Sequence, residues 1–175
     1  MRTRIMALIL GMIVGSGGTA LAFCFDEAGA MYGISPQLLW AISKGESDFN
    51  PAALNRNTNG TYDFGLMQIN SSWAPTLHKK GIPWDALADP CTNVKVGAWL
   101  LAQCVRDYGY SWAAVGCYNS RTPSKRDRYA ARIARLLSRE GATLRQAHRQ
   151  ERLVADAREP LLATPWEEVF GHASR

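Results

Sequence analysis

Two carboxylates, Glu46 and Asp63, are the groups in this chain best placed by type and spacing to do acid–base chemistry. Glu46 lies in "SKGESDFNP", and Asp63 follows seventeen residues later in "NTNGTYDFGLMQIN", a run otherwise made of glycines, amides, hydroxyls and apolar side chains. A pair of carboxyl groups in different environments can divide the roles of general acid and charge stabiliser between them. Whether the two acids form such a pair depends on the elements that carry them.

The first acid lies at the end of a predicted helix, "SPQLLWAISKGES", in which Ser35 can cap and Pro36 suits the first position. Leu39, Ile42 and Glu46 share one face at helical spacing. Burial and the negative end of the helix dipole both disfavour the carboxylate, so both raise its pKa, as a general acid requires. The alternative is a glutamate that points into solvent at the helix end.

The second acid follows a predicted hairpin turn at Asn59-Gly60, between two short runs of strand-forming residues. Alternation then places Thr61 and Asp63 on one face. Gly65 ends the strand, and "LMQINSSW" is expected to begin another helix. The alternative role of Asp63 is to bond to the hairpin backbone.

The remaining elements are mostly helices. Helical patterns cover "DEAGAMYGI", "CTNVKVGAWLLAQCVRDYG", with Thr92 as cap and Gly109 as end, "SWAAVGCYNS", capped by Ser111, and "PSKRDRYAARIARLLSREG", with Tyr129, Ile133 and Leu136 or Leu137 inward. We expect a loop in "HKKGIPWDALADP" and only partial helix after Gly141. The fold class is therefore mainly α, with one small hairpin beside a cleft.

The N-terminal residues read as a secretory signal peptide over residues 1–22. Two arginines precede the apolar run "IMALILGMIVG", and Ala20-Leu21-Ala22 fits the cleavage pattern. A membrane anchor is the alternative, but the run is short for a span. The predicted organisation is a signal peptide (1–22), a folded domain (23–140) and a basic, flexible tail (141–175), in a protein exported to the periplasm and not integral to the membrane.

Four cysteines remain after the predicted cleavage, and an even number in an oxidising compartment favours disulfides over free buried thiols. Three pairings are open. We predict Cys24–Cys91, which would tie down the mature N-terminus, and Cys104–Cys117, which would join two successive helices. No spacing of cysteines and histidines supports a metal site, and no cofactor motif is present.

The positive charge is concentrated in the C-terminal third. The whole chain has a net charge of +5, and residues 121–175 carry twelve Lys and Arg against seven Asp and Glu. An anionic partner such as a cell-wall polymer or a membrane surface would suit this excess, and a solvated helix face is the alternative. An exported chain without a nucleic-acid-binding motif is not expected to bind nucleic acid.

Three short motifs occur in this chain in the same order as in a known protein family. Glu46-Ser47, then Gly65-Leu66-Met67-Gln68-Ile69, then Cys117-Tyr118-Asn119 resemble the E-S, G-L-M-Q-I and A-Y-N motifs of the soluble lytic transglycosylase (SLT) domain in the lysozyme superfamily. The likeness covers about residues 24–119. "CFDEA" and "DPC" also resemble the small peptidoglycan-cleaving enzymes of type III secretion, conjugation and pilus systems. Cys117 departs from the usual alanine.

This resemblance implies cleavage of the β-1,4 bond between N-acetylmuramic acid and N-acetylglucosamine in peptidoglycan strands. Glu46 would protonate the bridging oxygen and then deprotonate the muramoyl 6-hydroxyl, which closes a 1,6-anhydro ring. Tyr118 would orient Glu46, although it could also be a half-buried core tyrosine. The residues implied to line the site are Ser47, Met67, Gln68, Asn70, Tyr118 and Asn119, with Met67 serving shape more than chemistry.

The two families that this chain resembles differ at the position of Asp63. The stretch around it is also similar to animal c-type lysozymes, which have an aspartate at the matching place, whereas typical lytic transglycosylases lack it. The leading hypothesis is a lytic transglycosylase that opens the wall locally for a secretion, conjugation or pilus apparatus. The alternatives are a muramidase that uses Glu46 and Asp63 with water, and a non-catalytic peptidoglycan-binding subunit.

Overall fold

The computed structural model describes residues 24–162; the predicted signal peptide and residues 163–175 lie outside this range. The helices are α1 (Phe25–Tyr32), α2 (Pro36–Ser47), α3 (Ala74–Lys79), α4 (Pro90–Tyr108), α5 (Trp112–Asn119) and α6 (Pro123–Leu162), with 3₁₀ turns η1 (Ser71–Trp73) and η2 (Trp84–Ala88). The strands are β1 (Leu54–Arg56), β2 (Tyr62–Phe64) and β3 (Ile69–Asn70). The predicted mainly helical class is confirmed.

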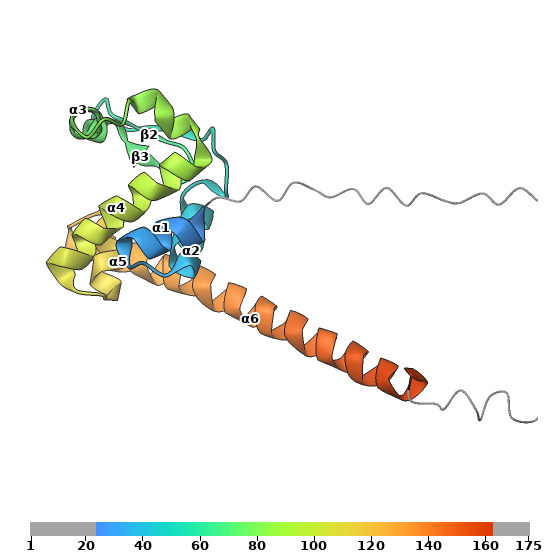
Figure 1. Cartoon of the computed structure of the whole chain (residues 1–175). Helices are drawn as coiled ribbons and strands as arrows, with labels where there is room; N and C mark the ends of the chain where they lie inside the picture. The colour runs from blue at the N-terminus through green and yellow to red at the C-terminus, as the bar shows by residue number, and fades with distance from the viewer. Residues whose placement is uncertain (1–23, 163–175) are drawn as a thin grey trace, which may run out of the picture.

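Two groups of elements are joined by α4 (Figure 1). The small sheet and α3 lie at one end, and α1, α2, α5 and the first part of α6 lie at the other, with α4 running between them. The core between these elements contains side chains with no exposed surface, among them Leu39, Ile42, Leu66, Leu101 and Ile133. Leu39 and Ile42 are buried on the face of α2 that also carries Glu46, as their spacing predicted.

The sheet is larger than the predicted hairpin. Strands β1 and β2 pair antiparallel around the Asn59-Gly60 turn, with Asn55 opposite Asp63. A third strand, β3, then pairs with β2 and places Asn70 opposite Asp63 from the other side. The helix expected to begin in residues 66–73 starts later than predicted. Gly65 and Gln68 adopt positive φ and return the chain to the sheet, so only η1 at the end of this segment leads into α3.

Three other local predictions need correction. The segment expected as a loop before α4 contains η2. Asp89, not Thr92, caps α4, since its carboxylate accepts the Thr92 backbone N–H at 2.7 Å. Ser35 precedes α2, but its hydroxyl bonds to Gln37 rather than to a backbone amide. The predicted cap at Ser111 and the helix end at Gly109 are confirmed.

The last helix continues past Gly141, where we expected only partial helix. It runs to Leu162, so the boundary predicted at residue 140 coincides with no break in the helix. Its first part packs on α2 and α5, and its second part projects from the body (Figure 1). Within residues 24–162 no helix offers an apolar stretch long enough to span a bilayer.

Both predicted disulfides are present. Cys24 and Cys91 join the start of the described chain to the first turn of α4, and Cys104 and Cys117 join α4 to α5. By closing loops in the unfolded chain, each bond is expected to contribute about 2–4 kcal/mol to stability. The second bond also fixes α5, whose last residues Tyr118 and Asn119 line the cleft described below.

Candidate active site

A polar cleft of about 750 Å³ lies between the sheet and the helical body. Amide and hydroxyl side chains dominate its walls, which suits a ligand rich in hydroxyl and acetamido groups. The lining residues are Glu46, Asn55, Asn57, Thr58, Asn59, Thr61, Asp63, Gln68, Asn70, Trp73, Leu100, Tyr118, Asn119 and Lys125. Glu46 and Asp63, which the sequence singled out, therefore meet at one cleft.

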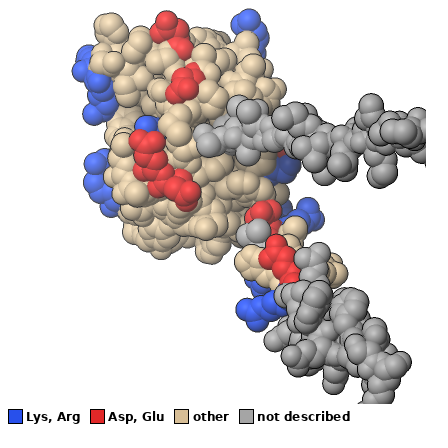
Figure 2. Space-filling view, turned by 45° about the vertical axis from the view of Figure 1, so that its right-hand side comes forward, with Lys and Arg blue, Asp and Glu red and all other residues tan. Residues whose placement is uncertain are grey.

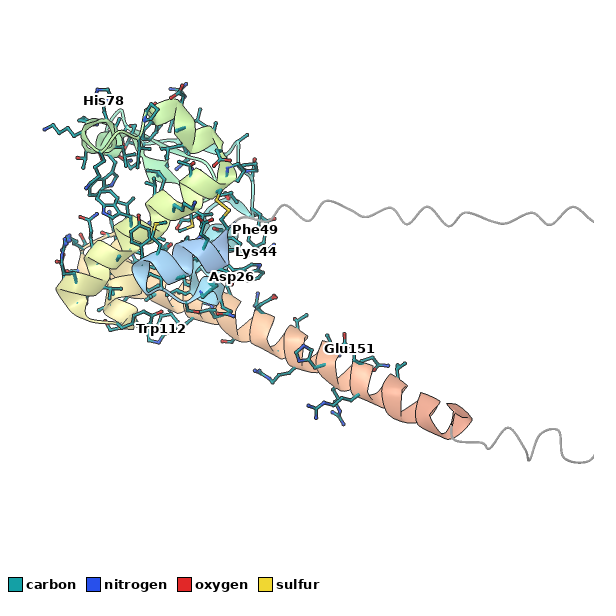
Figure 3. All side chains as sticks on the ribbon, viewed as in Figure 1. Asp26, Lys44, Phe49, His78, Trp112 and Glu151 are labelled. Atoms are coloured by element: carbon teal, nitrogen blue, oxygen red, sulfur yellow. A yellow bond between two sulfur atoms is a disulfide. The ribbon has the colours of Figure 1, made fainter. Side chains whose placement is uncertain are left out.

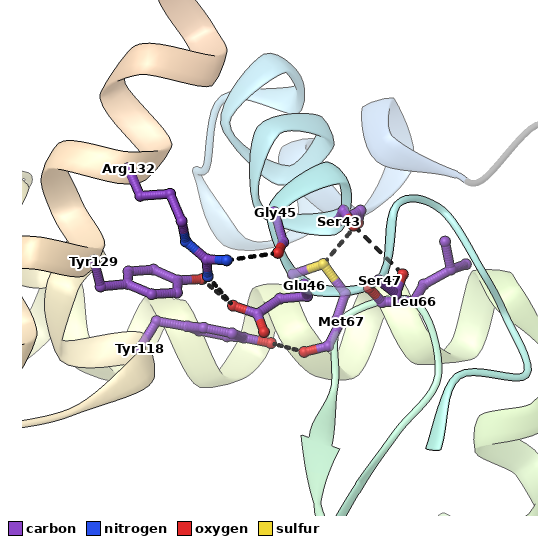
Figure 4. Close-up of polar contacts among 9 residues, drawn as sticks. All are labelled: Ser43, Gly45, Glu46, Ser47, Leu66, Met67, Tyr118, Tyr129 and Arg132. Atoms are coloured by element: carbon purple, nitrogen blue, oxygen red, sulfur yellow. Dashed lines mark hydrogen bonds and ion pairs between the residues drawn. The ribbon is translucent and has the colours of Figure 1, made fainter. Parts of the chain in front are cut away.

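Glu46 is held in place by two residues of α6 (Figure 4). The Tyr129 hydroxyl donates to Glu46 Oε1 at 2.5 Å, and the Arg132 guanidinium lies 3.5 Å from the same oxygen. Only 14% of the Glu46 side chain is exposed. Burial raises the pKa of Glu46 above its ordinary value of 4.5, while the Tyr129 hydrogen bond and then the Arg132 charge oppose the rise and the Asp63 charge adds to it.

The balance of these effects favours a proton-transfer role. A carboxyl group with a raised pKa keeps its proton closer to neutral pH, so it can act as a general acid. The hydrogen bond from Tyr129 holds the carboxyl group of Glu46 in one orientation. The helical spacing predicted burial of this acid, which the structure confirms, and burial is the largest cause that raises its pKa. The catalytic role itself remains a prediction.

Tyr118 does not orient Glu46, which corrects the expectation from the A-Y-N motif. Its hydroxyl donates instead to the Met67 carbonyl at 2.8 Å, and its ring stacks on that of Tyr129 with centroids 6.4 Å apart. Burial, followed by the charges of Glu46 and Asp63, raises the pKa of the Tyr118 phenol well above 10.0, so Tyr118 remains a donor. The sequence indicated that Tyr129 points inward, but could not show which ring reaches the acid.

Arg132 was missed by the sequence reasoning. Its guanidinium donates to the Gly45 carbonyl at 2.8 Å and lies 5.0 Å from the centre of the Tyr129 ring. It thereby satisfies a carbonyl in the last turn of α2 and pairs with Glu46 at once. A basic residue three positions after an inward tyrosine is the signal that could have identified it.

Close packing of α2 on α6 makes these contacts attainable. A Cβ atom added at Gly45 would lie 2.8 Å from Ile133 Cδ1 and 3.3 Å from Leu136 Cδ1. Only glycine lets the two helices approach this closely. The "KGES" segment therefore contributes both the acid and the flat surface against which its partners from α6 are placed.

Asp63 is fixed on the sheet side of the cleft. The Asn70 amide donates to one carboxylate oxygen at 2.7 Å, and the Asn57 amide donates to the other at 3.0 Å. Both amides line the cleft with it. Asp63 therefore bonds to side chains of the hairpin and β3, and not to the hairpin backbone as its structural alternative supposed.

The other residues implied by the motifs divide into two groups. Gln68, Asn70, Tyr118 and Asn119 line the cleft, whereas Ser47 and Met67 do not. Ser47 donates to the Leu66 carbonyl at 2.9 Å, and the buried Met67 sulfur accepts a hydrogen bond from Ser43 at 2.9 Å. Ser47 and Met67 thus hold the turn that carries the cleft wall.

Asn93 is a second residue that the sequence reasoning missed. This buried α4 side chain accepts from the Met67 N–H at 2.8 Å and donates to the Phe64 and Leu87 carbonyls at 3.2 and 3.1 Å. It lies so close to Gly65, at φ +80°, that an added Cβ would come within 2.1 Å of its amide nitrogen. Its place three residues before the apolar Val96, on the same face of α4, was the available signal.

Three tryptophans that could stack on sugar rings, Trp73, Trp84 and Trp112, have different surroundings. Trp73 lines the cleft and packs edge-on against Trp99, with centroids 5.6 Å apart. Trp84 packs edge-on against Tyr62. Trp112 is half exposed at the start of α5, away from the cleft (Figure 3). Trp73 is thus the tryptophan of the three that could contact a ligand in the cleft.

Replacing Tyr129 with phenylalanine tests the hydrogen bond to Glu46. The bond stabilises the carboxylate, so its loss raises the pKa of Glu46 further. We expect turnover to fall about tenfold and the alkaline limb of the kcat/KM profile to move to higher pH. Arg132→Gln should move it in the same direction. Tyr110→Phe, at an exposed tyrosine outside the cleft, is the matched control; an unmoved limb in Tyr129→Phe would contradict the assignment.

The fold and the site together define a class: a lysozyme-like, mainly helical protein with a small sheet and a buried acid in a polar cleft. An inactive mutant of the lytic transglycosylase Slt from Pseudomonas aeruginosa shares this fold, with a TM-score of 0.58, 21% identity, and coverage of 72% of this chain and 24% of that chain. At that identity the likeness concerns the fold alone.

The family is shown by sequence. The Transglycosylase SLT domain matches residues 23–134, so the chain belongs to this family and is a lytic transglycosylase. "Invasion protein IagB" of Salmonella typhimurium is 46% identical over 120 residues, covering 66% of this chain and 75% of that protein. "Protein IpgF" of Shigella flexneri is 40% identical over 134 residues, covering 74% and 88%. The predicted family is thereby confirmed.

Proposed function

We propose that the chain cleaves the β-1,4 bond between N-acetylmuramic acid and N-acetylglucosamine in peptidoglycan, with Glu46 as both acid and base. The observation that carries the proposal is the buried Glu46 side chain at the cleft, with a raised pKa and a fixed hydrogen bond from Tyr129. Glu46 gives its proton to the bridging oxygen as the bond from C1 breaks. It then takes the proton of the 6-hydroxyl, whose oxygen bonds to C1, so no water is consumed.

Mass analysis of the products tests this function. Digestion of purified sacculi should release muropeptides with 1,6-anhydro ends, which are one water lighter than reducing ends. A product consisting of reducing ends alone would replace the proposal with hydrolysis. No release of muropeptides by the mature protein would favour the third reading, a peptidoglycan-binding subunit without activity.

A muramidase is the second candidate, and the fixed position of the Asp63 side chain favours it. Both carboxylate oxygens of Asp63 accept hydrogen bonds from amide groups at the cleft, and the charge of Asp63 contributes to the raised pKa of Glu46. A second carboxylate placed in this way could stabilise positive charge at C1 or serve as the nucleophile of a retaining hydrolase. We propose electrostatic assistance, because the transglycosylase reaction itself needs only one acid.

Asp63→Asn separates these roles. We expect turnover to fall about tenfold while the anhydro ends persist, since charge stabilisation is lost and the acid remains. Asn55→Ala, which removes an uncharged side chain from β1 at the same cleft, serves as the comparison. A loss as deep as that of a Glu46 variant would make Asp63 essential and support the hydrolase, whereas undiminished turnover would reduce it to a structural residue.

We further propose that the enzyme acts in the periplasm after removal of residues 1–22, and that it opens the wall locally for a secretion, conjugation or pilus apparatus. The signal-like N-terminus and the cell-wall substrate of the family support export. The likeness to proteins named for invasion in Salmonella supports a task in assembling an envelope apparatus.

A further inference from the structure

Five basic residues form one stripe along the first part of α6. Lys125, Arg128, Arg132, Arg135 and Arg139 alternate at spacings of three and four, which places them on one helix face. All five are exposed. The stripe extends about 21 Å along the helix axis, at 1.5 Å per residue.

The charge of this basic stripe is largely unused within the described chain. Of the five, Arg132 pairs with Glu46, and the side chains of Arg128, Arg135 and Arg139 form no ion pair or hydrogen bond with the residues that the structure describes. The nearby acids Asp127 and Glu140 lie outside the three- and four-residue spacing of the stripe, so they are not on its face. Asp127 in addition pairs with Arg126.

The N-terminal part of the stripe lies at the cleft. Lys125 lines it, and Arg132 contacts the buried acid Glu46. Tyr129 and Ile133, on the adjoining face of α6, are buried against the body, so the stripe runs along the exposed side of the helix next to this buried face. A polymer that leaves the cleft past Lys125 and continues along α6 would have the guanidinium groups of the stripe beside it.

We propose that the basic stripe binds the carboxylates of the peptide stems that muramic acid carries, while the glycan occupies the cleft. This inference rests on the proposed function and deepens it, since the substrate would be stem-bearing strands rather than bare glycan. The sugar hydroxyls and acetamido groups are neutral, so the stem carboxylates supply the anions. Guanidinium groups suit them, because each offers a planar pair of donors to one carboxylate.

The test uses the mature chain with Glu46→Gln, so that binding is measured without cleavage. The stripe variant adds Arg128→Gln, Arg135→Gln and Arg139→Gln, and leaves Lys125 and Arg132 because they touch the site. The matched control adds Arg145→Gln, Arg149→Gln and Arg152→Gln. These exposed arginines lie on the projecting part of α6 that carries Glu151 (Figure 3), and their replacement removes the same charge.

Retention is measured on intact sacculi and on sacculi stripped of stems by an amidase. We expect the stripe variant to bind intact sacculi about tenfold more weakly than the control does, since three exposed ion pairs are each worth a small factor. The control and the stripe variant should bind stripped sacculi equally. The stem-dependent part of the binding should weaken with added salt. Thermal unfolding of both variants checks that they fold.

Three results would overturn the proposal. Retention of the stripe variant on intact sacculi equal to that of the Glu46→Gln chain alone would remove the stripe from substrate binding. An equal loss in both variants would indicate general attraction of a basic protein. Binding of the control, but not the stripe variant, to anionic lipid vesicles, with unchanged binding to sacculi, would make the stripe a membrane contact. Failure of the proposed cleavage chemistry would appear separately, as missing anhydro products from the unmodified enzyme.

The surface of the described chain carries both basic and acidic side chains. Figure 2 shows basic side chains on the globular body and on the projecting part of α6, with acidic ones between them.

Discussion

Replacing Glu46 with glutamine is expected to lower the release of muropeptides from sacculi about a thousandfold or more. Glutamine keeps the shape and can still accept the Tyr129 hydrogen bond, but it has no proton to give to the leaving oxygen and cannot take one from the 6-hydroxyl. Binding to sacculi should persist, so the loss falls on kcat. The measurement is single-turnover release of anhydro-muropeptides. Glu27→Gln, at an exposed acid paired with Lys95 on the body, is the matched control.

The same variant carries a prediction for stability. The folded pKa of Glu46 lies above its ordinary value of 4.5, so the folded state binds the proton more tightly than the unfolded state. As pH rises from 4.5 through the folded pKa, the wild type loses stability that the uncharged variant keeps. Glu46→Gln should therefore melt at the wild-type temperature near pH 4 and higher at neutral pH. Full activity, or a lower melting temperature at neutral pH, would contradict the role of a buried acid.

Replacing Asn93 with alanine is expected to destabilise the folded chain by about 3–5 kcal/mol, the largest stability effect that we predict. The change leaves the Met67 N–H and the Phe64 and Leu87 carbonyls without their partner in a buried place. The unfolding temperature should fall by about 10–20 °C. Differential scanning calorimetry measures the change.

Asn93→Ala should also reduce activity at temperatures where the variant remains folded. Met67 offers its carbonyl to Tyr118, so a shifted turn moves the wall of the cleft beside Glu46. Asn55→Ala, at an exposed asparagine of β1, should leave the melting temperature unchanged. An equal effect of the two substitutions on unfolding would show that the amide of Asn93 is not what holds the turn.

Together these residues show how the site is assembled from three directions. Helix α2 contributes Glu46, α6 contributes Tyr129 and Arg132, and α4 contributes Asn93, which fixes the turn after β2. Only the first of these elements carries a recognisable motif. The residues that tune and support the acid are therefore distributed over helices that are distant in the sequence.

The sequence by itself determined the local features of this protein. Periodicity placed Glu46 on the buried face of α2, and the Asn59-Gly60 pair predicted the turn that carries Asp63. The order of the three motifs predicted the family, and both disulfide pairings were correct. The first two properties depend on residues close together in the chain, and the family depends on motifs whose order survives without geometry. The Cys24–Cys91 bond, which spans 67 residues, was one of the pairings that the sequence left open.

Tertiary structure alone decided which groups meet at the acid. Tyr118 and Tyr129 both point inward, and the close contact of Gly45 with Ile133 selects Tyr129 as the partner of Glu46. The strand β3 was missed because its pairing with β2 depends on the positive φ of Gly65 and Gln68. The physical reason is the same in both cases: contacts between distant elements depend on packing at the scale of single atoms, which spacing along a chain does not encode.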